Sequence, residues 1–240
     1  MTERYDERAA THYAAYRPPL HEIILGRVLS RGGRSRVGAD VGCGTGCSAL
    51  ALANHCERVY GVDPSLSMLS RATPHPAVRY LCGAGERIPI ATGSIDVVTF
   101  AGSLFYADSD DTRAEVRRIC PAGTVVVYDF EVLLGTLLQR FGLASQALHS
   151  DYDHRASFWG APGFRELTVG SERVRLEVTA AELAHVLLSD SNRFDQFARR
   201  YNTVNSFPAL LDDLRPGPDR HTVEADIYYS TYKISASRVE

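Results

Sequence analysis

The sequence predicts an α/β fold in which helices cover both faces of a parallel sheet. The strand-forming segments are 36–41, 57–62, 78–82, 95–101 and 123–130, with helical stretches between them near 46–55, 65–72 and 109–119. Such alternation with short connections is typical of parallel sheets, because each helix returns the chain to the edge where the next strand starts. Glycine or acidic residues follow several of these strands. Ligands of such folds bind at the carboxyl edge of the sheet, so we expect the functional site there.

Proline, serine and glycine mark where the first elements begin and end. Pro18-Pro19 separates two helical pieces expected within residues 3–31, because proline breaks a helix and restricts the residue before it. Gly46 precedes a run of small and apolar residues that predicts the helix after the first strand. Pro64 and Ser65 supply a turn and a cap for the helix that follows the second strand.

The second half of the chain loses this regular alternation. We expect an amphipathic helix over 133–148 and a polar, aromatic loop over 149–162. Residues 164–169 and 173–178 predict paired strands around Gly170-Ser171, and Thr179 predicts the cap of a helix that runs to about residue 188. Helical pieces are expected near 193–200 and 206–214. Residues 225–234 are rich in β-formers and predict a closing edge strand.

Composition restricts the classes of protein that this chain can belong to. Its 240 residues, 45% of them hydrophobic, can form one substantial core, so one domain with embellishments is expected. A formal net charge of −3 gives no basic surface for nucleic acid, and no apolar run reaches the length of a membrane span. Five cysteines without a framework spacing and a charged N-terminus predict a reduced, cytoplasmic protein. We expect a monomer or a homodimer.

A glycine-rich turn after the first strand is the strongest functional signal. Gly42, Gly44 and Gly46 follow residues 37–41, and Asp63 ends the next strand. Glycines let a ligand approach the backbone, and a carboxylate at the end of the second strand is placed to accept hydrogen bonds from a ribose. Cys47 stands where a dinucleotide-binding fingerprint has its third glycine. The pattern therefore predicts a nucleotide-type site for a ligand other than a dinucleotide.

The acid within the turn motif, Asp40, indicates which ligand this is. A carboxylate there repels a pyrophosphate and can attract, directly or through water, an amino-acid ammonium group. With Asp63, the pattern D-x-G-x-G-x-G resembles the class I S-adenosylmethionine-dependent methyltransferases, whose cofactor has no phosphates and carries a methionine tail. Residues 83–98 and 118–130 resemble later motifs of the same family, although Ala84 stands where an acid is common and Gly85 where alanine is usual.

The resemblance implies a fold and a division of the chain. It implies a Rossmann-like, seven-stranded, mainly parallel sheet with an antiparallel last strand, an N-terminal helical lid and a C-terminal helical cap. The divisions are a lid over 1–32, a cofactor-binding core over 33–132, a cap and substrate region with the sixth strand over 133–220, and a closing strand over 221–240. The N-terminus resembles the trans-aconitate-methyltransferase-like group, which favours a small-molecule acceptor.

The resemblance also implies residues that bind the cofactor or shape the acceptor pocket. The cofactor-binding candidates are Tyr13, Arg17, Asp40, Gly42, Gly44, Gly46, Asp63, Pro64, Met68, Ala84, Gly85, Glu86 and Ser103. The substrate candidates are Arg17, Phe105, Tyr106, Trp159 and His185. Packing roles are open for the tyrosines, for Trp159 and for His185.

No catalytic motif is compulsory for methyl transfer, because the sulfonium donor is already activated. A hydroxyl or amine acceptor needs a base, whereas a carboxylate does not. The candidates are His149, His154 and Tyr106. The two histidines flank two aspartates, but their five-residue spacing places them on different faces of a helix, so no metal site is expected. A solvated loop is the open alternative for both histidines.

Two other functions fit parts of the pattern. A non-catalytic protein that binds S-adenosylmethionine or S-adenosylhomocysteine as a regulator or scaffold would keep the glycine motif without turnover. An RNA or protein methyltransferase would need a basic groove and a recognition domain, and the sequence offers neither. The sequence therefore favours methyl transfer to a small molecule.

Overall fold

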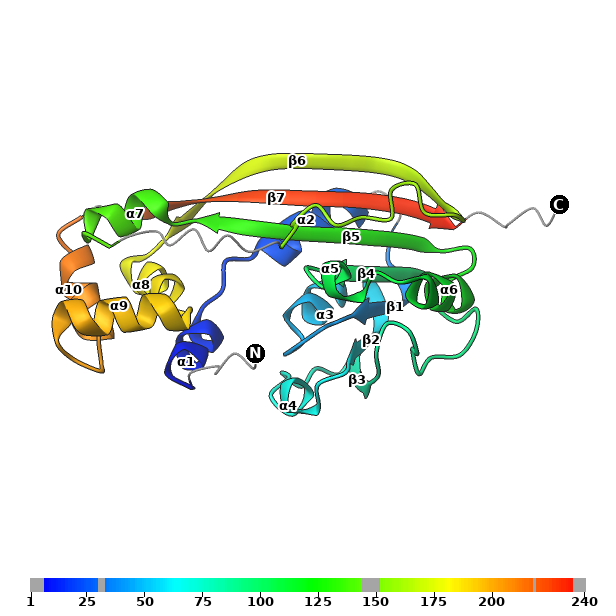
Figure 1. The fold of residues 1–240 in the computed structure, drawn as a ribbon, viewed down its shortest axis with the longest axis horizontal. Helices are drawn as coiled ribbons and strands as arrows, with labels where there is room; N and C mark the ends of the chain where they lie inside the picture. Colours follow the sequence, from blue (N-terminus) through cyan, green and yellow to red (C-terminus); the bar gives the residue numbers. More distant parts are fainter. Residues whose placement is uncertain (1–6, 30–32, 144–151, 218, 235–240) are drawn as a thin grey trace. The chain divides into compact units, whose positions relative to one another are not determined.

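A seven-stranded sheet with the order β3-β2-β1-β4-β5-β7-β6 organises the chain (Figure 1). The structure is a computed structural model that describes residues 7–29, 33–143, 152–217 and 219–234. The strands are β1 (Ser35–Val41), β2 (Cys56–Asp63), β3 (Val78–Cys82), β4 (Val97–Ala101), β5 (Thr124–Leu133), β6 (Phe164–Val178) and β7 (His221–Ile234). β1 pairs in parallel with β2 and β4, β2 with β3, and β4 with β5. β7 runs opposite to β5, so the α/β fold class with an antiparallel last strand is confirmed.

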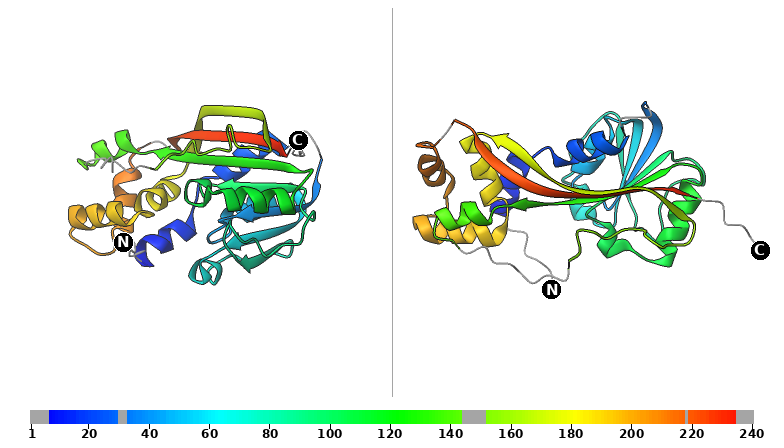
Figure 2. Two further views of the ribbon diagram at one scale, coloured as in Figure 1. Left: turned by 45° about the vertical axis from the view of Figure 1, so that its right-hand side comes forward. Right: turned by 90° about the horizontal axis from the view of Figure 1, so that it is seen from above.

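Ten helices lie in the described part of the chain. They are α1 (Glu7–Ala15), α2 (Leu20–Leu29), α3 (Cys47–Leu52), α4 (Leu66–Leu69), α5 (Leu104–Ala107), α6 (Asp110–Ile119), α7 (Gly135–Arg140), α8 (Ala180–Leu188), α9 (Ser191–Tyr201) and α10 (Phe207–Leu214). Seen from above in Figure 2, α2 and α6 lie on opposite faces of the sheet, as the alternating pattern predicts. Thr179 caps α8 as expected, in a reciprocal capping box with Glu182.

Three predictions for the second half of the chain are wrong. β5 extends to Leu133, and the helix expected from that residue is the short α7; residues 144–148 of that prediction lie outside the described chain. Residues 164–178 form one strand, not a pair around Gly170. A Cβ on Gly170 would lie 2.4 Å from Cζ of Tyr229, so this glycine permits close cross-strand contact and does not make a turn. β7 lies between β5 and β6, so the edge strand is β6.

The chain divides into two compact units. The sheet unit comprises Leu20–Glu131, Asp151–Glu172 and Ile227–Glu240. Its buried core includes Phe100, Phe158 and Tyr232. The helical unit comprises Met1–Pro19, Val132–Ser150 and Arg173–Asp226, and its core is built largely from α8, α9 and α10.

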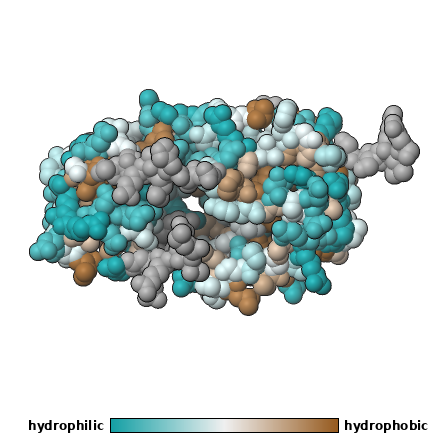
Figure 3. Space-filling view, viewed as in Figure 1, coloured by the Kyte–Doolittle hydropathy of each residue, from teal (hydrophilic) through white to brown (hydrophobic). Residues whose placement is uncertain are grey.

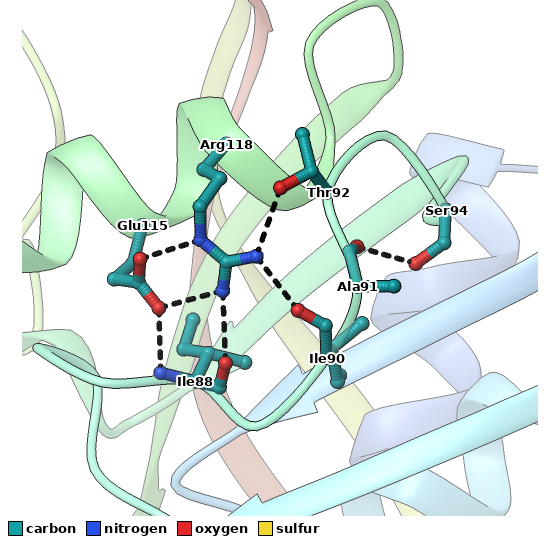
Figure 4. Close-up of polar contacts among 7 residues, drawn as sticks. All are labelled: Ile88, Ile90, Ala91, Thr92, Ser94, Glu115 and Arg118. Atoms are coloured by element: carbon teal, nitrogen blue, oxygen red, sulfur yellow. Dashed lines mark hydrogen bonds and ion pairs between the residues drawn. The ribbon is translucent and has the colours of Figure 1, made fainter.

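Arg118 fastens the segment between β3 and β4 to α6 (Figure 4). Its guanidinium donates to the carbonyl oxygens of Ile88 at 2.9 Å and Ile90 at 2.7 Å. It also donates to both carboxylate oxygens of Glu115, at 2.6 and 2.8 Å, and Glu115 accepts the N–H of Ile88 at 2.7 Å. Hydrogen bonds from Arg118 lower the pKa of Glu115. Arg118 therefore has a structural role in joining α6 to the segment at 88–90.

We expect Arg118→Met to lower the free energy of unfolding by about 2–3 kcal/mol, because Glu115 and two carbonyl groups lose a charged donor. Arg118→Lys should recover part of this loss, since an ammonium keeps the charge but not the planar fork. Urea unfolding of both variants, with the exposed Arg165→Met as control, measures the difference. Equal stability of the Met and Lys variants would contradict a role for the fork.

Candidate functional site

The glycine-rich turn connects β1 to α3 at the carboxyl edge of the sheet. The N–H groups of Gly42 and Cys43 donate to the carbonyl oxygen of Val62, at 2.8 and 3.1 Å. Gly42, Gly44 and Gly46 have φ angles of 75°, 54° and 89°. These are left-handed conformations, which only glycine adopts without strain. The turn is therefore fixed against β2 by its own backbone.

The three glycines have different surroundings. A Cβ on Gly42 would lie 2.4 Å from Cβ of Ser103, and one on Gly46 would lie 2.1 Å from the hydroxyl oxygen of Tyr80. A Cβ on Gly44 would meet nothing within 4 Å. Protein packing therefore leaves no room for a side chain at Gly42 or Gly46, whereas Gly44 faces open space where a ligand can approach the backbone.

This difference predicts separable effects of two substitutions. Gly46→Ala should displace Tyr80, whose hydroxyl donates to the Thr73 carbonyl oxygen at 3.0 Å, and should lower the free energy of unfolding by about 3 kcal/mol. Gly44→Ala should cost about 1–2 kcal/mol through its left-handed conformation alone. Its methyl group should nevertheless weaken cofactor binding more than tenfold. Thermal unfolding and calorimetric titration of the two variants check both effects, and unaltered binding by Gly44→Ala would contradict the ligand-facing role.

Asp63 joins the end of β2 to the glycine-rich turn. One carboxylate oxygen accepts the N–H of Gly44 at 2.9 Å, and the other accepts the N–H of Ser65 at 2.8 Å. The side chain is largely buried. Each oxygen keeps a further lone pair, so the carboxylate can hold the turn and still accept from a hydroxyl group.

Asp40 lies behind the turn and is fully buried. Its two carboxylate oxygens accept hydrogen bonds from the hydroxyls of Ser48, at 2.5 Å, and Thr99, at 2.7 Å. Burial raises the pKa of Asp40 to about 6, against the opposing effect of these two hydrogen bonds. Because its side chain is buried, Asp40 can affect a bound ammonium group through space or through Ser48.

The residues predicted to border an adenine ring follow β2 and β3. Pro64 is exposed, and Met68 on α4 is half-buried. The neighbouring Leu66 is 69% exposed, an unusual position for leucine, and is a second candidate for packing on a ring. Ala84 is half-buried and Glu86 is exposed, but Gly85 is buried. A Cβ on Gly85 would lie 2.8 Å from the hydroxyl oxygen of Thr112, so its close neighbour is α6.

The end of β4 continues into α5, which carries the predicted pocket residues. Ser103 donates from its hydroxyl to the carbonyl oxygen of Val41 and so connects β4 to the glycine-rich turn. Phe105 is partly exposed and Tyr106 is 78% exposed. Their rings lie 4.9 and 5.6 Å from that of Tyr152, centroid to centroid. The structure therefore brings Phe105 and Tyr106 together with the segment that carries His154.

Asp129 is a candidate that the sequence interpretation missed. Its carboxylate accepts from Nδ1 of His154 and from the hydroxyl of Tyr152, each at 2.7 Å. Burial and the hydrogen bond to Asp129 raise the pKa of Tyr152. The available signal was that Asp129 follows the apolar run of the fifth strand as Asp63 follows that of the second. His149 lies outside the described residues.

The other predicted residues have different surroundings. Trp159 is 79% exposed. Arg17 and His185 belong to the helical unit, as does Tyr13, whose side chain lies outside the described ones. Nδ1 of His185 lies 3.0 Å from Nδ1 of His12, and burial lowers the pKa of His185. Their ligand contacts stay predictions.

Two other kinds of site are absent from the described part of the chain. Among the residues outside the masked stretches, no group of three or more His, Cys, Asp or Glu side chains could hold a metal ion. No described helix has the length and apolar character needed to cross a membrane. On the face in Figure 3, hydrophobic residues stand singly or in small groups among hydrophilic ones.

The part of the chain that contains the glycine-rich turn is similar to known proteins. Residues 39–127 match the family described as a methyltransferase domain. This match indicates similarity to methyltransferase domains over the glycine-rich turn and the strands around it. An open backbone at Gly44 beside the Asp63 carboxylate fits S-adenosylmethionine, a cofactor with a ribose and no phosphates.

The proteins that resemble this part of the chain are distant relatives. A Dictyostelium discoideum protein named as a methyltransferase is 24% identical over 123 residues, which cover 50% of this chain and 47% of that protein. The ubiquinone/menaquinone biosynthesis C-methyltransferase UbiE of Rubrivivax gelatinosus is 32% identical over 95 residues, 38% of each chain. A solved Anaeromyxobacter dehalogenans structure described as a type II methyltransferase superposes with a TM-score of 0.61 at 22% identity, covering 90% of this chain and 95% of that one. The chain thus matches less than half of these curated relatives, and the structural likeness shows the fold.

Proposed function

We propose that the chain is an S-adenosylmethionine-dependent methyltransferase that methylates a small-molecule acceptor at a hydroxyl or carboxylate oxygen. The observation that carries the proposal is the Asp63 carboxylate, which holds the N–H of Gly44 while that glycine faces open space. A ribose at this edge would meet a carboxylate, and the methionine tail would lie along an exposed backbone. The formal net charge of −3 supports a small-molecule acceptor, because a chain that methylates nucleic acid would be expected to carry an excess of basic residues.

Most of the predicted cofactor residues have a proposed role. Asp63 accepts from the ribose hydroxyls, and Gly42, Gly44 and Gly46 keep the turn open. Asp40 attracts the ammonium group from behind the turn. Met68 or Leu66 packs on one face of the adenine, and the backbone at Ala84 and Glu86 lies at its edge. Arg17 and Tyr13, from the N-terminal helical region, bind the methionine carboxylate or an acidic acceptor.

When bound, the cofactor supplies an activated methyl group, so the chain's tasks are positioning, exclusion of water and, for a hydroxyl acceptor, removal of a proton. Phe105 and Tyr106 contribute aromatic surface beside the end of β4. No metal is required for these tasks.

Calorimetric titration with S-adenosylmethionine and S-adenosylhomocysteine tests the proposal. We expect saturable binding of both at one site, followed by formation of S-adenosylhomocysteine with small hydroxyl or carboxyl acceptors. Absence of binding to the folded, ligand-free protein would overturn the proposal. Binding without turnover across both acceptor classes would favour a regulatory or scaffold protein.

A further inference from the structure

Asp129 and His154 meet at the same sheet edge as the cofactor turn. β4 and β5 pair up to Ala101 and Tyr128, so Asp129 comes immediately after the last residue of β5 that pairs with β4. His154 reaches it from the segment after α7, with Nδ1 at 2.7 Å from the carboxylate. Parallel strands end at one edge, and ligands of this fold bind there.

A short chain of contacts connects this pair to the glycine-rich turn. The hydroxyl of Tyr152 lies 2.7 Å from Asp129 and 2.8 Å from the carbonyl oxygen of Gly102. The next residue, Ser103, packs against Gly42, and its hydroxyl donates to the Val41 carbonyl oxygen. The pair therefore lies beside the residues that border the turn, all within the sheet unit.

The hydrogen bond to Asp129 determines which nitrogen of His154 is basic. A carboxylate only accepts, so Nδ1 of the neutral imidazole carries the hydrogen and Nε2 carries the lone pair. The His154 side chain is 32% exposed, which leaves room for a ligand to reach the ring. Asp129 would also stabilise the imidazolium that forms when Nε2 takes a proton.

His154 also lines a cavity of about 350 Å³ in the sheet unit. This volume is in the range of small-molecule sites. The Tyr228 ring stacks on His154 with a centroid distance of 6.0 Å, and the Arg155 guanidinium lies 5.3 Å from the centre of the Tyr228 ring. Aromatic walls with a few polar groups suit a flat ring that carries a hydroxyl group.

We propose that His154, positioned by Asp129, is the general base for an acceptor of one class, a hydroxylated aromatic compound bound in this cavity. The inference rests on the proposed methyltransferase function. The acceptor O–H gives its proton to Nε2, and the oxygen forms a bond to the methyl carbon. The carbon–sulfur bond breaks with its electron pair remaining on sulfur, which leaves a neutral thioether and an aryl methyl ether. The imidazolium then releases its proton to water.

Acceptors of different acidity distinguish a catalytic base from a histidine that is only structural, because an acceptor that is already ionised needs no base. A general base contributes about 10²–10⁴-fold to rate. We therefore expect His154→Gln to lower kcat for phenol or catechol at least 100-fold. The loss should be less than tenfold for 4-nitrophenol at pH 8, because that acceptor is ionised without help. The exposed His75→Gln, three residues before β3, is the matched control.

Asp129→Asn tests positioning with two readouts that activity alone would not provide. Nitrogen NMR of the imidazole should show the Nδ1–H tautomer of His154 in the ligand-free parent chain and its loss in Asp129→Asn. In both Asp129→Asn and His154→Gln, the rate should depend less on pH along the rising limb of the pH–rate profile. The groups that face His154 are Asp129, Tyr152 and Tyr228, with Arg155 beyond Tyr228. Tyr152→Phe keeps the His–Asp pair and should keep the tautomer.

Four outcomes would overturn the inference without touching the proposed function. They are equal losses for phenol and 4-nitrophenol, an Nε2–H tautomer in the parent chain, turnover of benzoate alone, and no turnover of any phenol by protein that binds S-adenosylmethionine. Lack of S-adenosylmethionine binding would instead overturn the methyltransferase assignment, so the two failures are distinguishable.

Discussion

Asp63→Ala should weaken S-adenosylmethionine binding at least 100-fold. The carboxylate has two expected tasks, to accept from the ribose hydroxyls and to hold the N–H groups of Gly44 and Ser65. A hydrogen bond to a charged group contributes about 1.5–3 kcal/mol, so the loss of two ligand contacts alone corresponds to a factor of 100 or more. Calorimetric titration measures the dissociation constants, with the exposed Glu57→Ala on the same strand as control.

A ligand lacking one hydroxyl separates contact with the ribose from support of the turn. The 2′-deoxy analogue of S-adenosylhomocysteine should bind the parent chain about tenfold or more weakly than S-adenosylhomocysteine itself. In Asp63→Ala the two ligands should bind with similar affinity, because the partner of the missing hydroxyl is gone. If the analogue loses as much affinity in the variant as in the parent chain, Asp63 supports the turn without contacting the ribose.

The glycine-rich turn could be read from the sequence because its chemistry is local. Strand, turn and strand-end acid occupy residues 37–63, and their spacing fixes both the backbone and the position of Asp63. The left-handed φ angles at Gly42, Gly44 and Gly46 agree with that interpretation. The sequence could not tell which glycine faces open space, because Tyr80 and Ser103, which exclude side chains at the other two, come from distant segments.

Interactions between distant segments account for what the sequence interpretation missed. Asp129 is recognisable as a site residue only through its contact with His154, which lies 25 residues later in the sequence. Arg118 looks like a surface helix residue until the segment at 88–90 lies beside it. Gly170 resembles a turn residue because the sequence does not show Tyr229 packing against it. In each case the decisive partner is far away along the chain.

Asp40 should make cofactor affinity and stability depend on pH in opposite directions. Burial raises the pKa of its carboxyl to about 6. A cationic ammonium favours the ionised carboxylate, so affinity for S-adenosylmethionine should rise with pH through about 6 and level off above it. At pH 5 about nine-tenths of such a carboxyl is protonated, and affinity should be about tenfold lower than at pH 7.

Stability of the ligand-free chain should change with the opposite sign. The fold holds a proton on Asp40 that the unfolded chain, with its ordinary carboxyl pKa, releases near pH 4. The stabilisation associated with that proton is therefore complete below about pH 4 and is lost as pH rises through about 6. A rise from 3.8 to about 6 corresponds to about 3 kcal/mol, an upper limit for this single group.

Asp40→Asn should remove both dependences, because the amide carries no charge and its oxygen can still accept from a hydroxyl of Ser48 or Thr99. Urea unfolding and calorimetric titration between pH 5 and 7 measure the two quantities in the parent chain and the variant, with Glu57→Gln as the matched exposed control. Affinity that stays level over this range would show that Asp40 does not act on the bound ammonium group. Stability that changes equally in Asp40→Asn would assign the proton to another residue.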